Sequence, residues 1–387
     1  MSNDWTYHTN MSTGHHIFDT SLKFHPEQPY NDLPDLPPAA QLETVRVLKR
    51  CIDARAKLAE LKQLADGMPD QAILINTIPI LEARASSEIE NVVTTGDELF
   101  RIQQLGEGGA DPAAREAYRY RTALRRGFDL LADRPLGTRV AVEVCSTITD
   151  VEMEVRRVPG TQVINTRTGK AIYTPPVGEQ LLHEKLSSWE RFLHQAEELD
   201  PLIRMAAGHY QFEAIHPFTD GNGRTGRILN LLYLCEQDLL SRPVLYLSGY
   251  INRHRPDYYR LLLKVTAENA WEDWLLFMID AVRSTAAWTI EKIRAIRLLQ
   301  QKAEEFLRRE VPDLYSYELL QVLFTQPYCR IGHLVDAGIV QRQQASVYLK
   351  RLVELGMLKE QKVGRTKLFV HKRYLELLLS DGNEVRG

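Results

Sequence analysis

Apolar residues recur at steps of three and four through most of this chain, which is the spacing of one buried helix face. The first such stretch runs from residue 39 to about 64, and a second from about 79 to 92. A third helix is predicted after Asp200-Pro201, a good N-cap followed by proline at the first helical position, and a fourth from about 222 to 237. The pattern predicts a mainly helical protein.

The helical spacing breaks between residues 155 and 176. Two short β-favouring runs, 161–164 and 171–174, flank a polar turn at 165–170. Short strands on either side of a polar turn are typical of a β-hairpin. We therefore expect one hairpin inside an otherwise helical region.

Composition divides the chain into four predicted parts. The first forty residues are rich in Pro, Asp, Asn and His and predict an extended segment that wraps a domain. A long charged helix is predicted around 287–309, with a boundary just after it. The predicted parts are an N-terminal arm (1–40), an N-terminal helical region (41–110), a catalytic core (111–309) and a small C-terminal module (310–387).

The C-terminal module resembles a winged helix. Two short helices are predicted at 317–324 and 331–337, then a third at 342–355 and two strands within 357–370. The third helix would be the recognition helix, with a leading face made of Arg342, Gln343, Gln344, Ser346 and Lys350. Residues 310–387 hold 11 Lys and Arg against 9 Asp and Glu, which is a weak electrostatic footprint for DNA. Binding of DNA, binding of protein and homodimerisation therefore all stay open for this module.

Bulk properties narrow the class further. The 387 residues exceed the roughly 250 to 300 at which a single core stops growing, so several domains are expected. The net charge of −3 gives no general attraction to nucleic acid or anionic membranes. Four scattered cysteines predict reduced thiols without disulfides or zinc. With neither an apolar leader nor a run of roughly 18 apolar residues, the chain is expected to be cytoplasmic, without membrane contact.

The strongest chemical signal is the stretch HPFTDGNGRTGR, residues 216–227. Gly221 and Gly223 let the backbone approach a ligand closely, and the first N–H groups of the next helix are free to bind phosphate. Arg224 and Arg227 lie one turn apart, so both can reach one polyphosphate. The stretch predicts a phosphate site.

Two further side chains add chemistry to that site. Asp220 supplies a carboxylate that suits Mg²⁺, an ion usually held by one or two carboxylates plus substrate phosphates. His216 has an ordinary pKa near neutrality and precedes the phosphate site, which suits a general base. Phe218 is interpreted as a core anchor for the loop.

The same twelve residues are similar to the signature of the Fic family, HPFx[DE]GNGRxxR, and every fixed position is filled. The resemblance implies a helical Fic-type core with a hairpin flap, and transfer of AMP from ATP to a Ser, Thr or Tyr hydroxyl of a protein or of the enzyme itself. It makes His216 the base and Asp220 the Mg²⁺ ligand. The implied nucleotide-binding residues are Gly221, Asn222, Gly223, Arg224, Thr225, Gly226 and Arg227, with Arg227 on the γ-phosphate.

The resemblance extends to two flanking segments. Ala171, Ile172, Tyr173 and Thr174 correspond to the family's flap, whose exposed edge aligns a target segment by strand addition, with Ile172 or Tyr173 as a clamp. Tyr258 and Tyr259 resemble the paired tyrosines that line the base pocket. An ordinary hairpin and ordinary aromatic packing are the alternatives for these two segments.

The residues 86–91, SSEIEN, fit the family's inhibitory pattern [ST]xxxE[GN], with Ser86 first and Glu90 as its carboxylate. A bidentate pair between Glu90 and Arg227 would occupy the guanidinium that the γ-phosphate needs. Low activity of the wild type is therefore expected. Removal of AMP by the same enzyme, a different donor such as UTP or CDP-choline, and a DNA-binding regulator that only senses nucleotide are the alternatives.

Overall fold

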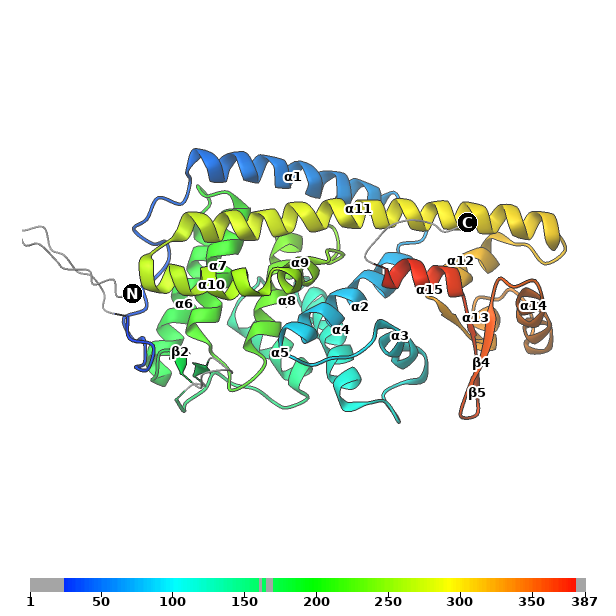
Figure 1. Cartoon of the computed structure of the whole chain (residues 1–387), viewed down its shortest axis with the longest axis horizontal. Helices are drawn as coiled ribbons and strands as arrows, with labels where there is room; N and C mark the ends of the chain where they lie inside the picture. The colour runs from blue at the N-terminus through cyan, green and yellow to red at the C-terminus, as the bar shows by residue number, and fades with distance from the viewer. Residues whose placement is uncertain (1–23, 160–161, 165–169, 381–387) are drawn as a thin grey trace, which may run out of the picture.

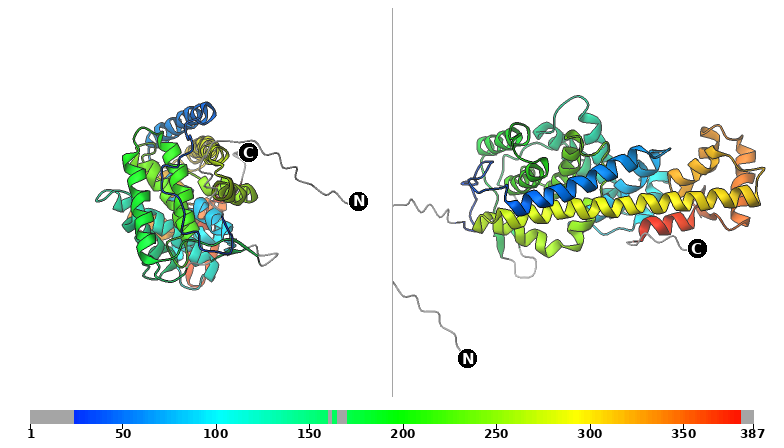
Figure 2. Two further views of the ribbon diagram at one scale, coloured as in Figure 1. Left: turned by 90° about the vertical axis from the view of Figure 1, so that its left-hand side faces the viewer. Right: turned by 90° about the horizontal axis from the view of Figure 1, so that it is seen from above.

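A single 40-residue helix, α11 (Trp271–Glu310), runs along the molecule and joins its two ends (Figure 1). The computed structural model describes residues 24–159, 162–164 and 170–380. Helix α1 (Val45–Asp66) lies beside α11 in each view (Figure 2). The charged pattern at 287–309 predicted only the second half of α11, because the first half has fewer charged residues and lacks that pattern. None of the helices in the described ranges is long and apolar enough to cross a membrane.

The centre of the larger end is the antiparallel pair α7 (Pro201–Ile215) and α8 (Asn222–Glu236), whose residues are buried on nearly all sides. Burial on all faces is expected of a helix surrounded by others. The surrounding helices are α2 (Ala72–Ile89), α3 (Gly96–Leu105), α4 (Pro112–Leu130), α5 (Thr138–Thr149), α6 (Glu179–Gln195), α9 (Leu247–Arg253) and α10 (Arg255–Glu268). Asp200 caps α7 as predicted, since its carboxylate accepts from the backbone N–H of Leu202.

Two helix starts differ from the prediction. Helix α1 begins at Val45 rather than at 39, because the Thr44 side chain accepts a hydrogen bond from the N–H of Val47 and caps it there. Helix α2 begins at Ala72 and carries Pro79 in its interior, although the sequence suggested Pro79 as a first residue. Burial of α2 on several sides outweighs the local cost of proline.

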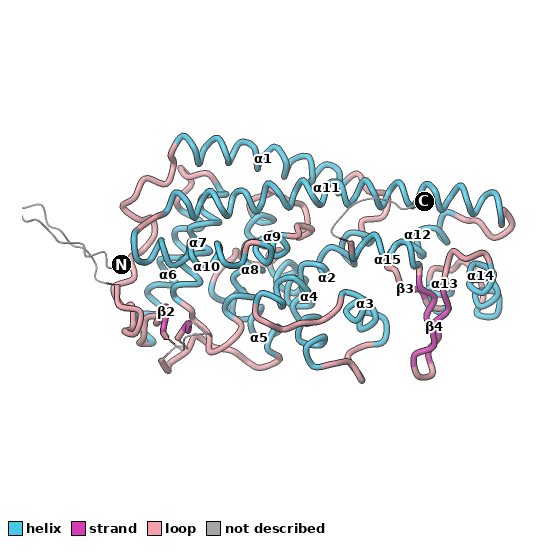
Figure 3. Tube along the Cα trace, viewed as in Figure 1, coloured by secondary structure: helices cyan, strands magenta, loops and turns pink. Residues whose placement is uncertain are grey.

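The predicted hairpin is present as β1 (Val163–Ile164) and β2 (Ala171–Tyr173), drawn in magenta near one end of Figure 3. The strands are antiparallel, with Val163 opposite Tyr173. Most of the predicted turn, residues 165–169, lies outside the described residues. We call residues 162–164 and 170–174 the flap.

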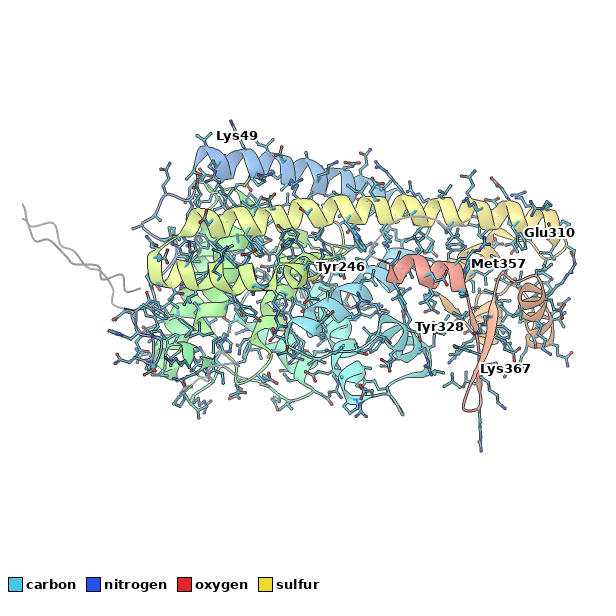
Figure 4. All side chains as sticks on the ribbon, viewed as in Figure 1. Lys49, Tyr246, Glu310, Tyr328, Met357 and Lys367 are labelled. Atoms are coloured by element: carbon cyan, nitrogen blue, oxygen red, sulfur yellow. The ribbon has the colours of Figure 1, made fainter. Side chains whose placement is uncertain are left out.

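The C-terminal module has the element order of a winged helix: α12 (Tyr317–Thr325), β3 (Tyr328–Cys329), α13 (Ile331–Asp336), α14 (Arg342–Glu354), β4 (Lys359–Val363), β5 (Thr366–Val370) and α15 (Lys372–Leu379). Its sheet order is β3-β5-β4. The module packs on the N-terminal helices, where the hydroxyl of Tyr328, labelled in Figure 4, donates to Asp97 on α3. The fold class, a helical core with a hairpin and a small winged helix, is confirmed.

Candidate active site

His216 sits at the C-terminal end of α7, in the left-handed backbone region (φ 51°, ψ 59°). A residue other than glycine is uncommon there and needs support from its surroundings. Its N–H donates to the carbonyl of Phe212, and its own carbonyl accepts from Nε of Arg156 at 2.8 Å. Burial lowers the pKa of His216 to about 4, so the imidazole is neutral at neutral pH and able to accept a proton.

Arg156 is a structural support that the sequence did not reveal. It is buried, and its guanidinium also donates to the carbonyls of Pro176 (2.6 Å) and Ile215 (3.2 Å). The side chain therefore ties the flap region to the end of α7. The neighbouring Arg157 is exposed, and nothing in the local sequence distinguishes the two.

The loop after His216 is closed by its own side chains. The amide of Asn222 accepts from the N–H of Phe218 and donates to the carbonyl of Phe218, both at 2.8 Å. Phe218 is fully buried, as expected of a core anchor. Gly221 takes φ 77° at the start of α8, where a side chain would be strained. These contacts fix the position of the N-terminus of α8, which has no side-chain cap. Asp220 lies exposed just before it.

A cavity of about 740 Å³ opens over this loop and collects residues from five parts of the chain. His216 and Gly223 line it from the loop and helix start, and Arg227 from the next turn of α8. The predicted flap residues Ile172 and Tyr173 also line it, as do Tyr258, Tyr259 and Glu90. Among the described residues, its lining does not include Asp220, Gly221, Asn222, Arg224, Thr225, Gly226, Ala171, Thr174 or Ser86.

Arg227 is held by the predicted inhibitory segment. Its Nε donates to Oγ of Ser86 at 2.8 Å, and its Nη2 donates to Oε1 of Glu90 at 2.8 Å and to the carbonyl of Ser86 at 3.0 Å. The contact with Glu90 is thus single rather than bidentate, because Ser86 takes the Nε edge of the guanidinium. A β-carbon at Gly223 would collide with the Glu90 carboxylate, so glycine is needed for this approach.

Helix α2 presents Glu90 from its C-terminal cap. The following residue, Asn91, has φ 64°, the left-handed conformation that asparagine and glycine adopt most readily after a helix. Burial is the largest single influence on the pKa of Glu90 and raises it, but the charge and hydrogen bond of Arg227, together with the charges of Arg224 and Arg255, outweigh burial, so the pKa is lowered. The pair is therefore ionic at neutral pH.

Arg224, one turn before Arg227, has different surroundings. Its Nη1 donates to Oε1 of Glu116 on α4, and its Nη2 lies 3.7 Å from Oδ1 of Asp220. Only 5% of its side chain is exposed, and it is not among the residues that line the cavity. Glu116 was not predicted, because one acidic residue on an amphipathic helix carries no sequence signal of its own.

The two tyrosines at the start of α10, Tyr258 and Tyr259, differ in burial and in their contacts. Tyr258 is buried and its hydroxyl is 2.8 Å from Nε2 of His209, whereas Tyr259 is 40% exposed and packs edge-on against Tyr258. Arg255 lies over the Tyr259 ring. Both tyrosines line the cavity, so the predicted aromatic wall is assembled there.

Two further carboxyl groups lie near Arg227 and were missed. Glu213 lines the cavity from α7, and its Oε1 has no hydrogen-bond partner among the described residues. Glu82 on α2 is fully buried and accepts from the N–H of Ser248 at 2.9 Å and from the hydroxyl of Tyr120 at 3.2 Å. Burial raises the pKa of both to about 7. Acidic residues on buried faces could have been a signal for them.

Fold and site together define a Fic-type protein, and three family models match in order along the chain. They are the Fic/DOC family N-terminal model (residues 48–129), the Fic/DOC family model (144–234) and the C-terminal domain of SoFic-like protein adenylyltransferase (298–374). The chain belongs to the Fic/DOC family.

Its relatives are similar over limited stretches. Protein adenylyltransferase fic-1 of Caenorhabditis elegans is 42% identical over 62 residues, 15% of this chain and 12% of that protein. Protein adenylyltransferase Fic of Aedes aegypti is 31% identical over 154 residues, 37% of this chain and 28% of that protein. The chain therefore spans well under a third of the length of these relatives.

The fold has a counterpart among solved structures. A Fic family protein from Desulfovibrio desulfuricans superposes with a TM-score of 0.55 at 16% identity, covering 86% of this chain and 98% of that one. At this identity the likeness concerns the fold alone.

Proposed function

We propose that this chain is a protein adenylyltransferase that moves AMP from ATP to a Ser, Thr or Tyr hydroxyl of a target protein or of itself. One observation carries the proposal: His216 and Arg227 line the same cavity, with the uncapped start of α8 between them. A base and a phosphate-binding cation on either side of free backbone amides suit nucleotidyl transfer. The relatives that are similar over limited stretches are named protein adenylyltransferase, which agrees with this proposal.

The chemistry follows from the side chains. Neutral His216 takes the proton of the attacking hydroxyl as its oxygen bonds to the α-phosphorus, and the bond from that phosphorus to the β-phosphate bridge breaks to release pyrophosphate. The amides of Asn222, Gly223 and Arg224 would hold the α- and β-phosphates, and Arg227 the γ-phosphate. The neighbouring Thr225 and Gly226 would serve as packing for this turn, since both are buried. Tyr258 and Tyr259 would wall the base.

Asp220 is the residue that would hold Mg²⁺. Its carboxylate is exposed at the start of α8, where one protein carboxylate plus substrate phosphates suits this ion. Bound there, Mg²⁺ would offset the negative charge of the phosphates and of the departing pyrophosphate. The residues present fit that role.

We also propose that Glu90 keeps the wild type at low activity. Its carboxylate holds the Nη2 of Arg227 that a γ-phosphate would need. Competition between a fixed intramolecular carboxylate and a phosphate on one guanidinium favours a misplaced or weakly bound ATP. Glu90→Gly removes the competitor without removing any group proposed to touch the nucleotide.

The test is intact mass spectrometry of Glu90→Gly protein incubated with Mg-ATP, with the Glu90→Gly/His216→Ala double variant as control. A mass gain equal to AMP in the first and none in the second is expected. A gain only with UTP or CDP-choline would refute ATP as the donor, and no gain with any of them would refute the transferase.

The domain limits are proposed as well. We place an N-terminal helical region at 41–110, the catalytic core at 111–309 and the winged-helix module at 310–387. Support comes from α11, which ends at Glu310 just before the first helix of the module.

A further inference from the structure

The C-terminal module has one side that takes no part in packing on the N-terminal helices. Its polar contacts with α3 come from the segment between α12 and α13, where Gln326 accepts from Gln104 at 2.5 Å and Arg330 donates to the Gln104 carbonyl at 2.8 Å. Helix α14 and the hairpin of β4 and β5, which we call the wing, lie side by side at the end of the molecule (Figure 1). Within the described ranges, neither forms a hydrogen bond or ion pair with a residue outside the module.

Helices α13 and α14 form a helix-turn-helix, with Gly338 in the left-handed region (φ 68°) in the connection between them. One face of α14 is buried in the module. Gln343, Val347 and Lys350 follow one another at helical spacing on the opposite face, and all three are exposed. An exposed second helix with polar residues in its first turns has the form that enters the major groove of DNA.

Positive charge is concentrated on the same elements. Residues 341–367 hold seven Lys and Arg against two Glu, whereas the remainder of 310–387 holds four Lys and Arg against seven Asp and Glu. The small net charge of the module therefore conceals one strongly basic part, made of α14 and the wing. A basic part of this kind is the electrostatic signature of a nucleic-acid surface.

Most of this charge has no counter-charge within the protein. Arg351 pairs with Asp313, and Lys367 pairs with Glu360. Lys359 is exposed on the face of β4 that also carries Val363, which lines a small cavity beside α3. The remaining cations, which are exposed and have no ion pair among the described residues and which we call the four unpaired cations, are Arg342, Lys350, Lys362 and Arg365.

The wing concentrates charge at a cost to its own stability. Lys362 and Lys367 lie directly opposite each other on the two strands, and like charges in that position destabilise a sheet. Glu360 offsets only Lys367, and Arg365 adds another charge in the turn. Figure 4, where Lys367 is labelled, shows that the wing projects away from α11. A polyanion lying against the wing tip would offset this repulsion.

We propose that the module binds duplex DNA, with the first half of α14 in the major groove and the wing tip on the sugar-phosphate backbone. Gln343 contacts the edge of an adenine, and Val347, which is 60% exposed, contacts the methyl group of a thymine. The four unpaired cations contact phosphates.

The charge pattern favours DNA over a protein partner on this surface. In a symmetric homodimer built through it, the same basic patch of each subunit would face its copy. The core of a protein interface is depleted of charge and rich in aromatic residues, whereas this surface offers one exposed aliphatic residue among cations and amides.

The test is fluorescence anisotropy of a labelled DNA duplex of random sequence, titrated with the full-length protein. Four phosphate contacts predict that the affinity falls roughly 150-fold between about 50 and 200 mM NaCl. Lys362→Gln/Arg365→Gln should weaken binding at least about tenfold at about 50 mM NaCl and reduce the salt slope by about 2. Lys372→Gln, which removes an exposed charge of the same module on α15, should keep both affinity and slope.

Three results would overturn the inference: no binding in about 50 mM NaCl, a salt slope that the double variant leaves unchanged, or an equal loss in Lys372→Gln. An RNA duplex of the same length should bind at least about fivefold more weakly, because its narrow major groove does not admit a helix. Equal affinity for RNA would reject docking of α14 in the groove.

Sedimentation of the protein without DNA distinguishes the alternative use of this surface. Self-association that disappears in Lys362→Gln/Arg365→Gln, without DNA binding by the wild type, would assign the surface to a homodimer and reject the inference. The inference does not depend on adenylyl transfer, so His216→Ala protein should bind the DNA duplex as tightly as the wild type does.

Discussion

Arg224 and Arg227 lie one turn apart on α8, and the sequence assigned both to phosphate, yet their surroundings differ. Arg227 lines the cavity and is held by Ser86 and Glu90 from α2. Arg224 turns to Glu116 on α4 and is absent from the cavity lining. A motif specifies the residue type, whereas a partner contributed by a distant helix decides which way each guanidinium faces.

Both arginines are nearly fully buried, so each needs a carboxylate when no phosphate is bound. The two carboxylates are not equivalent. Glu90 forms part of the cavity wall, where a γ-phosphate could replace it, whereas Glu116 is not among the residues that line the cavity. We therefore expect one pair to be regulatory and the other to be structural, and four experiments test this difference.

The largest effect is expected from replacing each arginine by lysine in the Glu90→Gly background. Lysine keeps the charge but loses the planar fork that binds phosphate at two points. Arg227→Lys should slow AMP incorporation roughly 100-fold, and Arg224→Lys less than about tenfold. Equal losses would mean that Arg224 leaves Glu116 to bind the nucleotide.

The matching carboxylate variants should separate activity from stability. Glu90→Gln in the wild type should raise AMP incorporation roughly tenfold, because the charge that holds Arg227 is lost. Glu116→Gln should instead lower the free energy of unfolding by about 1 to 2 kcal/mol, a figure discounted because the glutamate is part-exposed. The loss is expected because buried Arg224 then keeps only the longer ion pair with Asp220, at 3.7 Å. Urea denaturation and labelling rates of both variants check this, and a stability loss in Glu90→Gln alone would reverse the assignment.

The same comparison shows how far the sequence could go. The loop at 216–227, the hairpin and the winged helix could be predicted because each is a local pattern of residue types. Arg156 and Glu116 could not, because their roles arise from carbonyls and side chains that lie far away in the chain. The single contact between Arg227 and Glu90, in place of a bidentate pair, likewise depends on where Ser86 is placed by α2.

A third experiment uses Glu213, a buried acid that lines the cavity near Arg227. The second acid beside Arg224, Asp220, is instead exposed. Because burial raises the pKa of Glu213 to about 7, Glu213 is neutral below that pH and becomes a carboxylate above it. The new charge faces the polyphosphate, so the Kd for ATP in Glu90→Gly protein should rise about fivefold from about pH 6 to about pH 8. Calorimetric titration measures this Kd at both pH values. Ionisation of ATP itself also changes the Kd with pH, and only this contribution should remain in Glu213→Gln. An unchanged pH dependence in Glu213→Gln would show that Glu213 does not sense the nucleotide.

The smallest effect is expected at Ser86, which gives Arg227 a second attachment to α2 that Arg224 lacks. Ser86→Ala removes the acceptor of Nε but leaves the backbone carbonyl and Glu90 in place. Losing one hydrogen bond to a guanidinium should loosen its hold and raise AMP incorporation in the wild type about threefold.

Ser87 provides the matched control for that variant. It is equally buried on the same helix, but its Oγ has no hydrogen-bond partner among the described residues, so Ser87→Ala should leave the rate almost unchanged. If Ser86→Ala slowed AMP incorporation while Ser87→Ala did not, Ser86 would be orienting Arg227 for the γ-phosphate. The inhibitory segment would then support the active arrangement as well as oppose it, and the contrast with Arg224 would lie in positioning rather than in inhibition.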